Sequence, residues 1–356
     1  MTQGLRVALI ASARFPIREP FAGGLEAHTW WLAHILTRRG HRVELFAAPG
    51  SDPALGTREL PVRSAVWSDA ARSDVSMPSV TWMEEHHAYL GLMLDLARDG
   101  EHRFDVVHNN SLHYLPVAMA SALSVPVVTT LHTPPTPWLE SAIKAQDSCP
   151  VTFTAVSRFT AGAWRATVPA ARVVRNGIDT RFWKPGPGGG GLVWSGRLVP
   201  EKAPHLAIEA ARTAGVPLRI AGPISDRAYF QERIEPLLGE GVRYVGHLDR
   251  RGLVELLGSA SAALVTPGWD EPYGLVVAEA LACGTPVCGF DRGALSEILT
   301  SDCGLLAPPG DVQAMAELIP RAMKLDRRDA RRRAEVFCSL DHTADAYTNL
   351  YEEVAR

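Results

Sequence analysis

The sequence has few cysteines, no excess of charge of either sign and no long apolar run. Its five cysteines are odd in number and lack paired Cys-x-x-Cys spacing, so they indicate neither a disulfide framework nor a zinc site of that kind. Lysine and arginine total 36 against 39 acidic residues, and a formal charge of −3 gives no reason to expect nucleic acid as a partner. We therefore expect a cytoplasmic protein with small, buried and reduced cysteines.

No segment predicts a signal peptide or a membrane span. The apolar stretch 5–10 is too short for a signal peptide, and the stretch 115–131 contains Pro126 and several small polar residues. Trp30 and Trp31 precede two arginines in a predicted helix, a pattern that an interfacial helix on a membrane would share. We favour a helix packed on its own sheet, and peripheral membrane contact is the alternative.

Short apolar runs alternate with segments of helical spacing along the whole chain. This alternation predicts α/β domains with doubly wound, Rossmann-like parallel sheets. With 356 residues, the chain is long enough for two such domains, each with its own core. The predicted strands are 5–10, 43–46, 106–108, 127–131, 153–156 and 173–174 in the first domain, and 192–195, 218–221, 242–245, 262–266, 286–290 and 304–306 in the second.

Glycine and proline dominate the segment 184–191, KPGPGGGG, which predicts a hinge between the domains. The first domain then covers 1–183 and the second 192–338, followed by a terminal helix in 339–356. The glycines also match G-x-G-x-x-G, but they precede a strand, whereas a dinucleotide fingerprint follows one and opens a helix. An NAD-dependent oxidoreductase is therefore not favoured.

The stretch 269–297, WDEPYGLVVAEALACGTPVCGFDRGALSE, carries Glu271 and Glu279 eight positions apart. Gly274 allows a sharp turn before an apolar helix in 275–283, so the loop with Glu271 meets a helix N-terminus. The free N–H groups there can bind a phosphate. Glu279 lies about two turns further on, roughly 12 Å by helix rise. Two carboxylates at this separation suit the hydroxyl-bearing groups on either side of a diphosphate, as in a nucleotide sugar.

This stretch resembles the E-x7-E element of retaining glycosyltransferases of the GT-B fold, family 4 in particular. The residues 284–287, Gly-Thr-Pro-Val, and 296–298, Ser-Glu-Ile, follow the helix as they do in family members. The resemblance implies two Rossmann-like domains that face each other across a deep cleft, with a terminal helix that crosses back to the first domain. It further implies that Glu271 holds hydroxyls of the donor sugar and Glu279 the ribose. An ordinary βα unit with solvated glutamates is the competing interpretation.

Arg197 and Lys202 lie in the string GRLVPEK, which follows the first strand of the second domain. Ligands of open α/β sheets bind at the carboxyl ends of strands, so both side chains are expected to point into the crevice between the domains. They resemble the basic pair that family members use to neutralise the donor diphosphate as the sugar–phosphate bond breaks. Metal-dependent sugar transferases hold the diphosphate through an Asp-x-Asp, which this sequence lacks. We therefore predict that no metal or other cofactor is required.

Gly23 and Gly24 join the first predicted strand to its helix and leave backbone N–H groups free to approach a phosphate. They resemble the glycine loop of the family, in which the position of Gly24 lies close to the donor phosphate. Glu26 and His28 follow, and we expect them to be hydrogen-bond partners within the helix rather than catalysts. The other donor-binding residues that the resemblance implies are Tyr273, Gly274, Leu275 and Val276, with His247 and Leu248 near the nucleobase.

His132 ends a predicted strand of the first domain and is followed by a proline-rich loop. It resembles the family histidine that faces the sugar from the acceptor side, and a buried structural histidine is the alternative. Loops at comparable positions offer further residues for an acceptor pocket. These candidates are Arg14, Asn109, Asn110, His113 and Trp138.

Together these patterns predict a retaining, metal-independent hexosyltransferase with Glu271, His132, Arg197 and Lys202 as its catalytic residues. The donor is predicted to be a nucleoside-diphosphate sugar, with UDP preferred on family frequency. The acceptor, a small molecule, a glycan or a lipid, is not identified by the sequence. A nucleotide-sugar epimerase or hydrolase of the same fold and a non-catalytic nucleotide-sugar sensor or scaffold are the alternatives.

Overall fold

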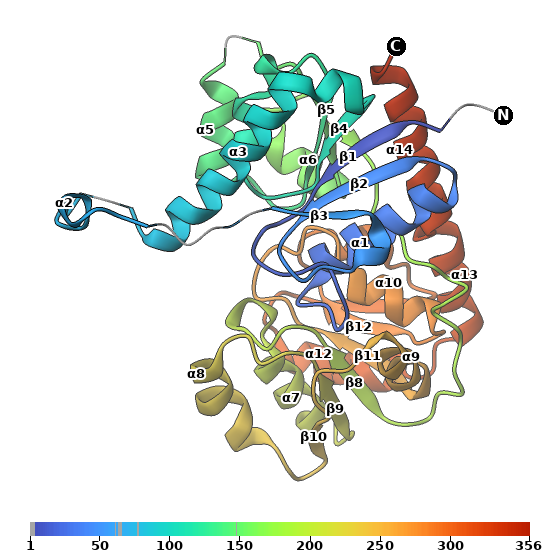
Figure 1. Cartoon of the computed structure of the whole chain (residues 1–356). Coiled ribbons are helices and arrows are strands. Elements are labelled where there is room, and N and C mark those ends of the chain that lie inside the picture. Colours follow the sequence, from blue (N-terminus) through green and yellow to red (C-terminus); the bar gives the residue numbers. More distant parts are fainter. Residues whose placement is uncertain (1–3, 61, 63–65, 77, 147) are drawn as a thin grey trace.

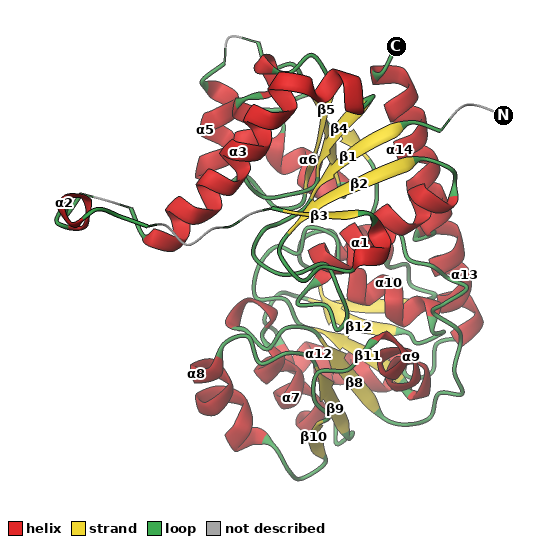
Figure 2. Ribbon diagram, viewed as in Figure 1, coloured by secondary structure: helices red, strands yellow, loops and turns green. Residues whose placement is uncertain are grey.

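The computed structural model describes the chain except residues 1–3, 61, 63–65, 77 and 147. It contains two α/β domains, one above the other in Figure 1, each built on a parallel sheet flanked by helices (Figure 2). Among the described residues the first sheet has seven strands in the order β3-β2-β1-β4-β5-β6-β7, and the second has six in the order β10-β9-β8-β11-β12-β13. The predicted fold class of two doubly wound, Rossmann-like domains is confirmed.

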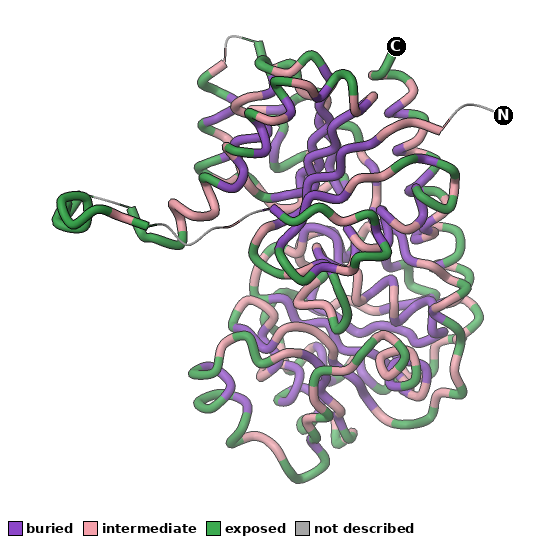
Figure 3. The backbone as a smooth tube through the Cα atoms, in the orientation of Figure 1, coloured by how far each residue is buried: buried purple, intermediate pink, exposed green. Residues whose placement is uncertain are grey.

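The strands of the first domain are buried, mostly apolar runs. β1 (Arg6–Ile10) lies between β2 (Arg42–Ala47) and β4 (Val106–Asn109) and pairs with both in parallel. All residues of β5 (Val127–Leu131) are buried, as expected for a parallel strand covered on both faces (Figure 3). The other elements are α1 (Gly24–Arg38), η1 (Pro53–Leu55), β3 (Thr57–Glu59), α2 (Asp69–Arg72), α3 (Val80–Arg103), α4 (Leu115–Ala118), η2 (Ala120–Ala122), α5 (Pro137–Lys144), β6 (Val151–Ala155), α6 (Arg158–Trp164) and β7 (Arg172–Val173).

The second domain repeats the alternation, and β8 (Leu192–Ser195) lies at the centre of its sheet between β9 (Leu218–Ala221) and β11 (Ala262–Val265). The remaining strands and helices follow in chain order. They are η3 (Pro200–Lys202), α7 (Pro204–Thr213), α8 (Arg227–Tyr229), η4 (Phe230–Ile234), η5 (Glu235–Leu237), β10 (Val242–Tyr244), α9 (Arg250–Ser259), α10 (Leu275–Ala282), β12 (Val287–Phe290), α11 (Leu295–Ile298), β13 (Gly304–Ala307), α12 (Val312–Ala322) and α13 (Arg327–Phe337).

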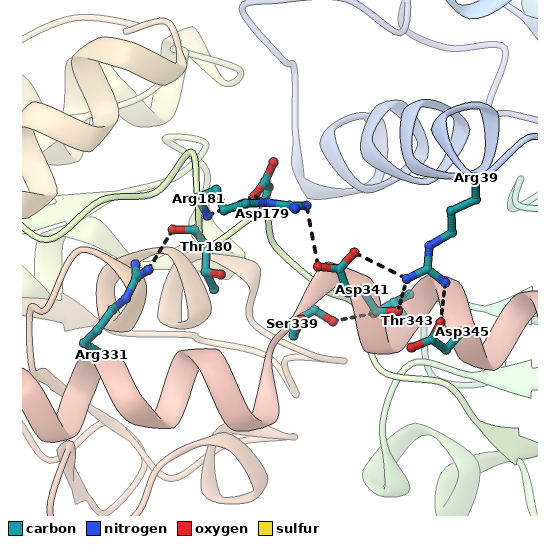
Figure 4. Close-up of polar contacts among 9 residues, drawn as sticks. All are labelled: Arg39, Asp179, Thr180, Arg181, Arg331, Ser339, Asp341, Thr343 and Asp345. Atoms are coloured by element: carbon teal, nitrogen blue, oxygen red, sulfur yellow. Dashed lines mark hydrogen bonds and ion pairs between the residues drawn. The ribbon is translucent and has the colours of Figure 1, made fainter.

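The chain crosses between the domains twice, and the two crossing segments bond to each other. The Ile178 N–H donates to the Cys338 carbonyl (2.8 Å), and the Leu340 N–H donates to the Ile178 carbonyl (3.0 Å). A side chain on Gly177 would meet Leu340 Cα at 2.5 Å, so only glycine fits this approach. Figure 4 shows the polar contacts around the crossing, in which Arg331 donates to the Thr180 carbonyl.

The glycine-rich segment 184–191, in which we expected the hinge, contains neither helix nor strand but is held on the second domain. The N–H groups of Gly186, Gly188 and Gly190 donate to the carbonyls of Cys283, Gly258 and Ser259. The passage between the domains therefore lies before this segment, where Ile178 pairs with Cys338 and Leu340.

Helix α14 (Leu340–Val354) follows the second domain but packs on the first, against α1 (Figure 1). Tyr347 and Tyr351 are buried in the core of the first domain. The Tyr347 hydroxyl lies 2.8 Å from the Thr130 hydroxyl, and that of Tyr351 lies 2.6 Å from Nδ1 of His108. In the described part of the chain, no helix is long and apolar enough to span a membrane.

Candidate active site

A solvent-open cavity of about 1000 Å³ lies between the two domains, at the carboxyl ends of strands from both sheets. The first domain contributes Phe21, Ala22, Gly23, Gly24, Ala27 and Trp31. The rest of the lining consists of Trp183, Ser195, Gly196, Arg197, Lys202, Ala221, Gly222, Pro223, His247, Leu248, Arg250, Leu253, Glu271, Leu275, Val276 and Glu279.

Two helix N-termini meet in this cavity. α1 begins at Gly24 and α10 at Leu275, and a side chain on Gly24 would meet Leu275 Cδ1 at 3.3 Å. Gly274, which precedes α10, has a φ of +101°, a conformation that favours glycine, and neither helix has a side-chain cap. The first N–H groups of a helix lack partners within it, and the aligned peptide dipoles place partial positive charge there. The facing N-termini therefore form a site for an anion.

Two cationic side chains complete this positive region. Lys202 donates to Oε2 of Glu271 in an ion pair, and the Trp269 indole N–H donates to the same oxygen (3.3 Å). The side chain of Glu271 is only 13% exposed. Arg197 is more open and lies 3.5 Å from the Glu201 carboxylate. An entering anion could therefore contact Arg197 directly, whereas Lys202 would have to share its charge between the anion and Glu271.

The backbone of Glu271 is fixed by a neighbouring turn. The Ala294 N–H donates to the Glu271 carbonyl (2.8 Å), and a side chain on Gly293 would collide with the backbone of Glu271. Gly293 also has a φ of +64°, so glycine is favoured there by both space and conformation. The turn at Gly293 therefore sets where the Glu271 side chain enters the cavity.

Glu279 lies in the second turn of α10 and lines the same cavity. Among the described residues its carboxylate has no hydrogen-bond or ion-pair partner. Burial raises the pKa of this carboxyl to about 8, because the charged form is poorly solvated there. A ligand hydroxyl would give the carboxylate the hydrogen bond that the protein does not provide.

Glu26 and His28 differ from each other in their environment. The Glu26 carboxylate is buried near Arg197, and a side chain on Gly23 would meet its Oε2 at 3.2 Å. Burial raises the pKa of Glu26, while a hydrogen bond from its own N–H and the charge of Arg197 oppose this rise. The expectation of a hydrogen-bonded His28 is wrong, because neither ring nitrogen has a partner in the described structure. Burial lowers the pKa of His28 to about 4, so its ring is neutral.

His132 is half-buried at the end of β5 and does not line the cavity between the domains. Its Nε2 donates to Oδ1 of Asn110 (2.5 Å), and Asn110 donates to the Thr29 hydroxyl (2.7 Å). The ring centre lies 5.4 Å from that of His28 on α1. Burial, followed by the neighbouring His28 and His108, holds the pKa of His132 well below its usual range. The ring is therefore neutral, and because its one N–H donates to Asn110, Nδ1 is left as a hydrogen-bond acceptor.

Some predicted residues lie away from the cavity. The side chain of Tyr273 is only 3% exposed and packs in the core of the second domain, so it does not reach the donor site. Asn109 is buried and accepts from the Ser111 N–H (3.1 Å). Arg14, His113 and Trp138 line a second cavity, in the first domain. His247 and Leu248 do line the first cavity, and Nε2 of His247 lies 3.1 Å from the Phe21 carbonyl of the opposite domain.

Several cavity residues were missed by the sequence reasoning. Arg250 opens α9 and inserts its guanidinium among aromatic rings, two of which belong to Trp30 and Trp31. Because Arg250 closely follows His247 and Leu248 in the sequence, its place in the same cavity could have been predicted. The backbone of Gly222 lies so close to that of Gly196 that a side chain at position 222 would collide with it. No sequence pattern pointed to that contact.

Comparisons with known proteins agree with this geometry. A family model described as glycosyl transferases group 1 matches residues 190–336, and one described as Glycosyltransferase Family 4 matches residues 22–182. A glycogen synthase of Mycobacterium tuberculosis is 31% identical over 354 residues, which covers 88% of this chain and 85% of the relative. A D-inositol 3-phosphate glycosyltransferase of Acidothermus cellulolyticus is 25% identical, over 98% of this chain and 90% of the relative.

Solved structures show the same architecture. A sucrose-phosphate synthase from Thermosynechococcus elongatus superposes with a TM-score of 0.79 at 20% identity, covering 98% of both chains. Anabaena HepE in complex with UDP and glucose gives a TM-score of 0.75 at 16% identity, covering 98% of this chain and 99% of that one. Two Rossmann-like domains around a shared cavity define the GT-B class of glycosyltransferases. The chain belongs to this family and is a glycosyltransferase enzyme.

Proposed function

We propose that the protein transfers a hexose from a nucleoside-diphosphate sugar, with UDP as the preferred nucleotide, to an acceptor hydroxyl, with retention of the anomeric configuration and without a metal ion. The observation that carries this proposal is the convergence of two helix N-termini and two cationic side chains on one cavity. A diphosphate is the part of the donor that needs such a surface. Lys202 and Arg197 would then supply the positive charge that a metal ion supplies elsewhere.

The remaining cavity residues suit the two ends of the donor. Glu279 has a carboxylate without a protein partner and lies on α10 beyond its N-terminus, where it can accept hydrogen bonds from ribose hydroxyls. Glu271 lies in the loop before α10, whereas Glu279 lies within the helix. Lys202 and Trp269 orient the Glu271 carboxylate. It can bind hydroxyls of the sugar. His247 and Leu248 line the part of the cavity proposed for the nucleobase.

In the proposed reaction, the bond between the anomeric carbon and the β-phosphate oxygen breaks and the acceptor oxygen bonds to that carbon on the same face. The acceptor proton passes to the departing phosphate oxygen, so no separate base is required. Arg197, Lys202 and the free N–H groups at the start of α10 stabilise the charge that develops on the diphosphate. The neutral ring of His132 would position the sugar or the acceptor from the side of the first domain.

The test is a thermal-shift panel of UDP, GDP, ADP and dTDP with their glucose and mannose derivatives, because a ligand that binds the native state raises the melting temperature. We expect the largest shift with a UDP-sugar. The product of the preferred donor, analysed by NMR, should keep the donor's anomeric configuration, and turnover should survive EDTA. An inverted product, or activity lost in EDTA and restored by magnesium, would contradict the proposal. Nucleotide binding without any transfer would instead favour the sensor or scaffold.

A further inference from the structure

A second cavity, of about 520 Å³ including its mouth, lies entirely in the first domain and shares no lining residue with the first. Its floor contains Tyr89 of α3 and Ser12 of the loop after β1, both buried. The Tyr89 hydroxyl accepts from the Ala13 N–H (2.9 Å) and donates to the Ala11 carbonyl (2.9 Å). These bonds tie α3 to the end of β1, so the floor is already formed without a ligand.

One wall of this cavity is aromatic, and part of it is uncovered. Trp138, at the start of α5, is 59% exposed, although burial of a large apolar ring is favourable. Its ring centre lies 6.0 Å from that of Trp82 on α3 and 6.1 Å from that of Tyr114, with an angle of 22° between the Trp138 and Tyr114 planes. The three rings thus form a supported surface with an accessible indole.

The polar groups of the cavity include one positive and one negative charge. Arg14 Nε lies 3.7 Å from Oε1 of Glu85, and their side chains are 66% and 22% exposed. The Ser12 hydroxyl accepts from the Arg14 N–H (3.3 Å). A guanidinium donates hydrogen bonds and a carboxylate accepts them, so this pair suits a ligand group that does both. A hydroxyl is such a group.

We propose that this second cavity binds a neutral sugar ring of the acceptor, which makes the acceptor a carbohydrate. The inference rests on the proposed glycosyl transfer. One face of a sugar ring consists largely of C–H groups and can pack on the indole of Trp138, while the hydroxyls at its edge reach Arg14 and Glu85. A lipid chain would cover the charged pair without satisfying it. A phosphate would meet the Glu85 carboxylate as well as Arg14 and gain little net attraction.

The position of the cavity agrees with this assignment. Its lining residues Ser12 and His113 follow β1 and β4, whose carboxyl ends also lead to the glycine loop and to Asn110. Asn110 in turn holds His132, beside α1. An acceptor anchored in the second cavity therefore lies at the same edge of the first sheet as His132 and as the glycine loop, which lines the donor cavity.

The experiment is saturation-transfer NMR on the whole protein with maltotetraose, cellotetraose, mannotetraose and xylotetraose, compared with myo-inositol 3-phosphate, in the absence of nucleotide. We expect transfer to ring C–H protons of at least one neutral oligosaccharide. Trp138→Ala should weaken its binding about tenfold, the scale of one lost aromatic contact, whereas Trp138→Phe should retain most of it. Leu94→Ala is the matched control, because Leu94 is another exposed apolar side chain (55%) on the first domain, on α3.

Binding of the inositol phosphate but of no oligosaccharide, binding of none of them, or sugar binding unchanged in Trp138→Ala would each overturn the inference. Binding of UDP-glucose is measured in parallel, so that failure of the sugar site can be told apart from failure of the proposed function. Trp138→Ala should leave nucleotide-sugar affinity unchanged. If the protein binds the oligosaccharide but no nucleotide sugar, the sugar site is supported and the proposed glycosyl transfer is contradicted.

Discussion

The guanidinium carbon of Arg250 lies 4.2 Å from the ring centre of Trp30, which links α9 of the second domain to α1 of the first. The same carbon lies 4.8 Å from the ring centre of Trp31 and 4.9 Å from that of Phe182. The guanidinium also pairs with Glu19. Burial lowers the pKa of Arg250 to about 10, which still leaves it charged at neutral pH. Cation–π contacts are strongest when the cation is desolvated, so this cluster favours the closed arrangement of the domains.

Replacing Arg250 should loosen that arrangement. In Arg250→Ala we expect a melting temperature lower by several degrees and a larger radius of gyration in solution scattering, because about 2 kcal/mol of desolvated cation–π contact is lost. The neighbouring Arg251 is exposed and serves as the control. If Arg250→Ala and Arg251→Ala behave alike in both measurements, the cluster does not hold the domains together.

Glu279 predicts a pH dependence of stability. Its pKa is raised from 4.5 to about 8 in the folded protein. Between these values the folded state keeps a proton that the unfolded chain has lost, so the free energy of unfolding should fall as pH rises and level off above about 8. Chemical denaturation across this window should show the slope in the wild type and a shallower one in Glu279→Gln. Equal slopes would contradict the raised pKa.

The same carboxyl should couple nucleotide binding to pH. Ribose hydroxyls that donate to Glu279 favour its ionised form, so affinity for UDP-glucose should increase as pH rises toward about 8. Glu279→Gln should bind more weakly and lose most of this pH dependence. Calorimetric titration at several pH values measures both effects, and a variant with wild-type affinity throughout would remove Glu279 from the ribose site.

Glu271 should affect turnover more than binding. Glu271→Ala frees Lys202 from its ion pair, so affinity for UDP should not fall. Turnover should drop about a hundredfold, the scale of one lost contact that strengthens in the transition state. Glu279→Ala provides the contrast, since it should mainly weaken nucleotide binding. Steady-state kinetics and UDP titration on both variants would decide, and parallel losses in both would argue against the division of roles.

His132 should be needed for transfer but not for binding of free nucleotide, because it lies outside the cavity that the nucleotide enters. His132→Ala should reduce transfer about a hundredfold or more. His102→Ala, which replaces an exposed histidine, is the control. A purely structural role through Asn110 would instead lower the melting temperature with little effect on turnover. Unchanged turnover in a stable protein would exclude His132 from the reaction.

The fold was largely readable from the sequence because buried parallel strands are nearly continuous apolar runs. The sequence did not predict β3 (Thr57–Glu59), because this strand is short and polar and lies at the edge of the sheet. The donor side of the cavity was also accessible, because the segment 269–297 places two carboxylates around one helix N-terminus.

Contacts between distant segments were not readable. The ion pair between Lys202 and Glu271 joins two residues that were each predicted to touch the donor, but nothing in their local sequence showed that they touch each other. Tyr273 was assigned to the donor site from its neighbours, yet the turn at Gly274 directs its side chain into the core. The Arg250 cluster contains residues of both domains, so the sequence of one domain alone cannot predict it.

The crossing of α14 has a consequence for how the protein is made. Tyr347 and Tyr351 fill the core of the first domain, but translation reaches them only after the whole second domain. Domains usually fold in the order in which they leave the ribosome. Here the first domain emerges with His108 and Thr130 lacking their tyrosine partners, while the second domain already has all its strands. The domain that is synthesised first is therefore the one that completes its folding last.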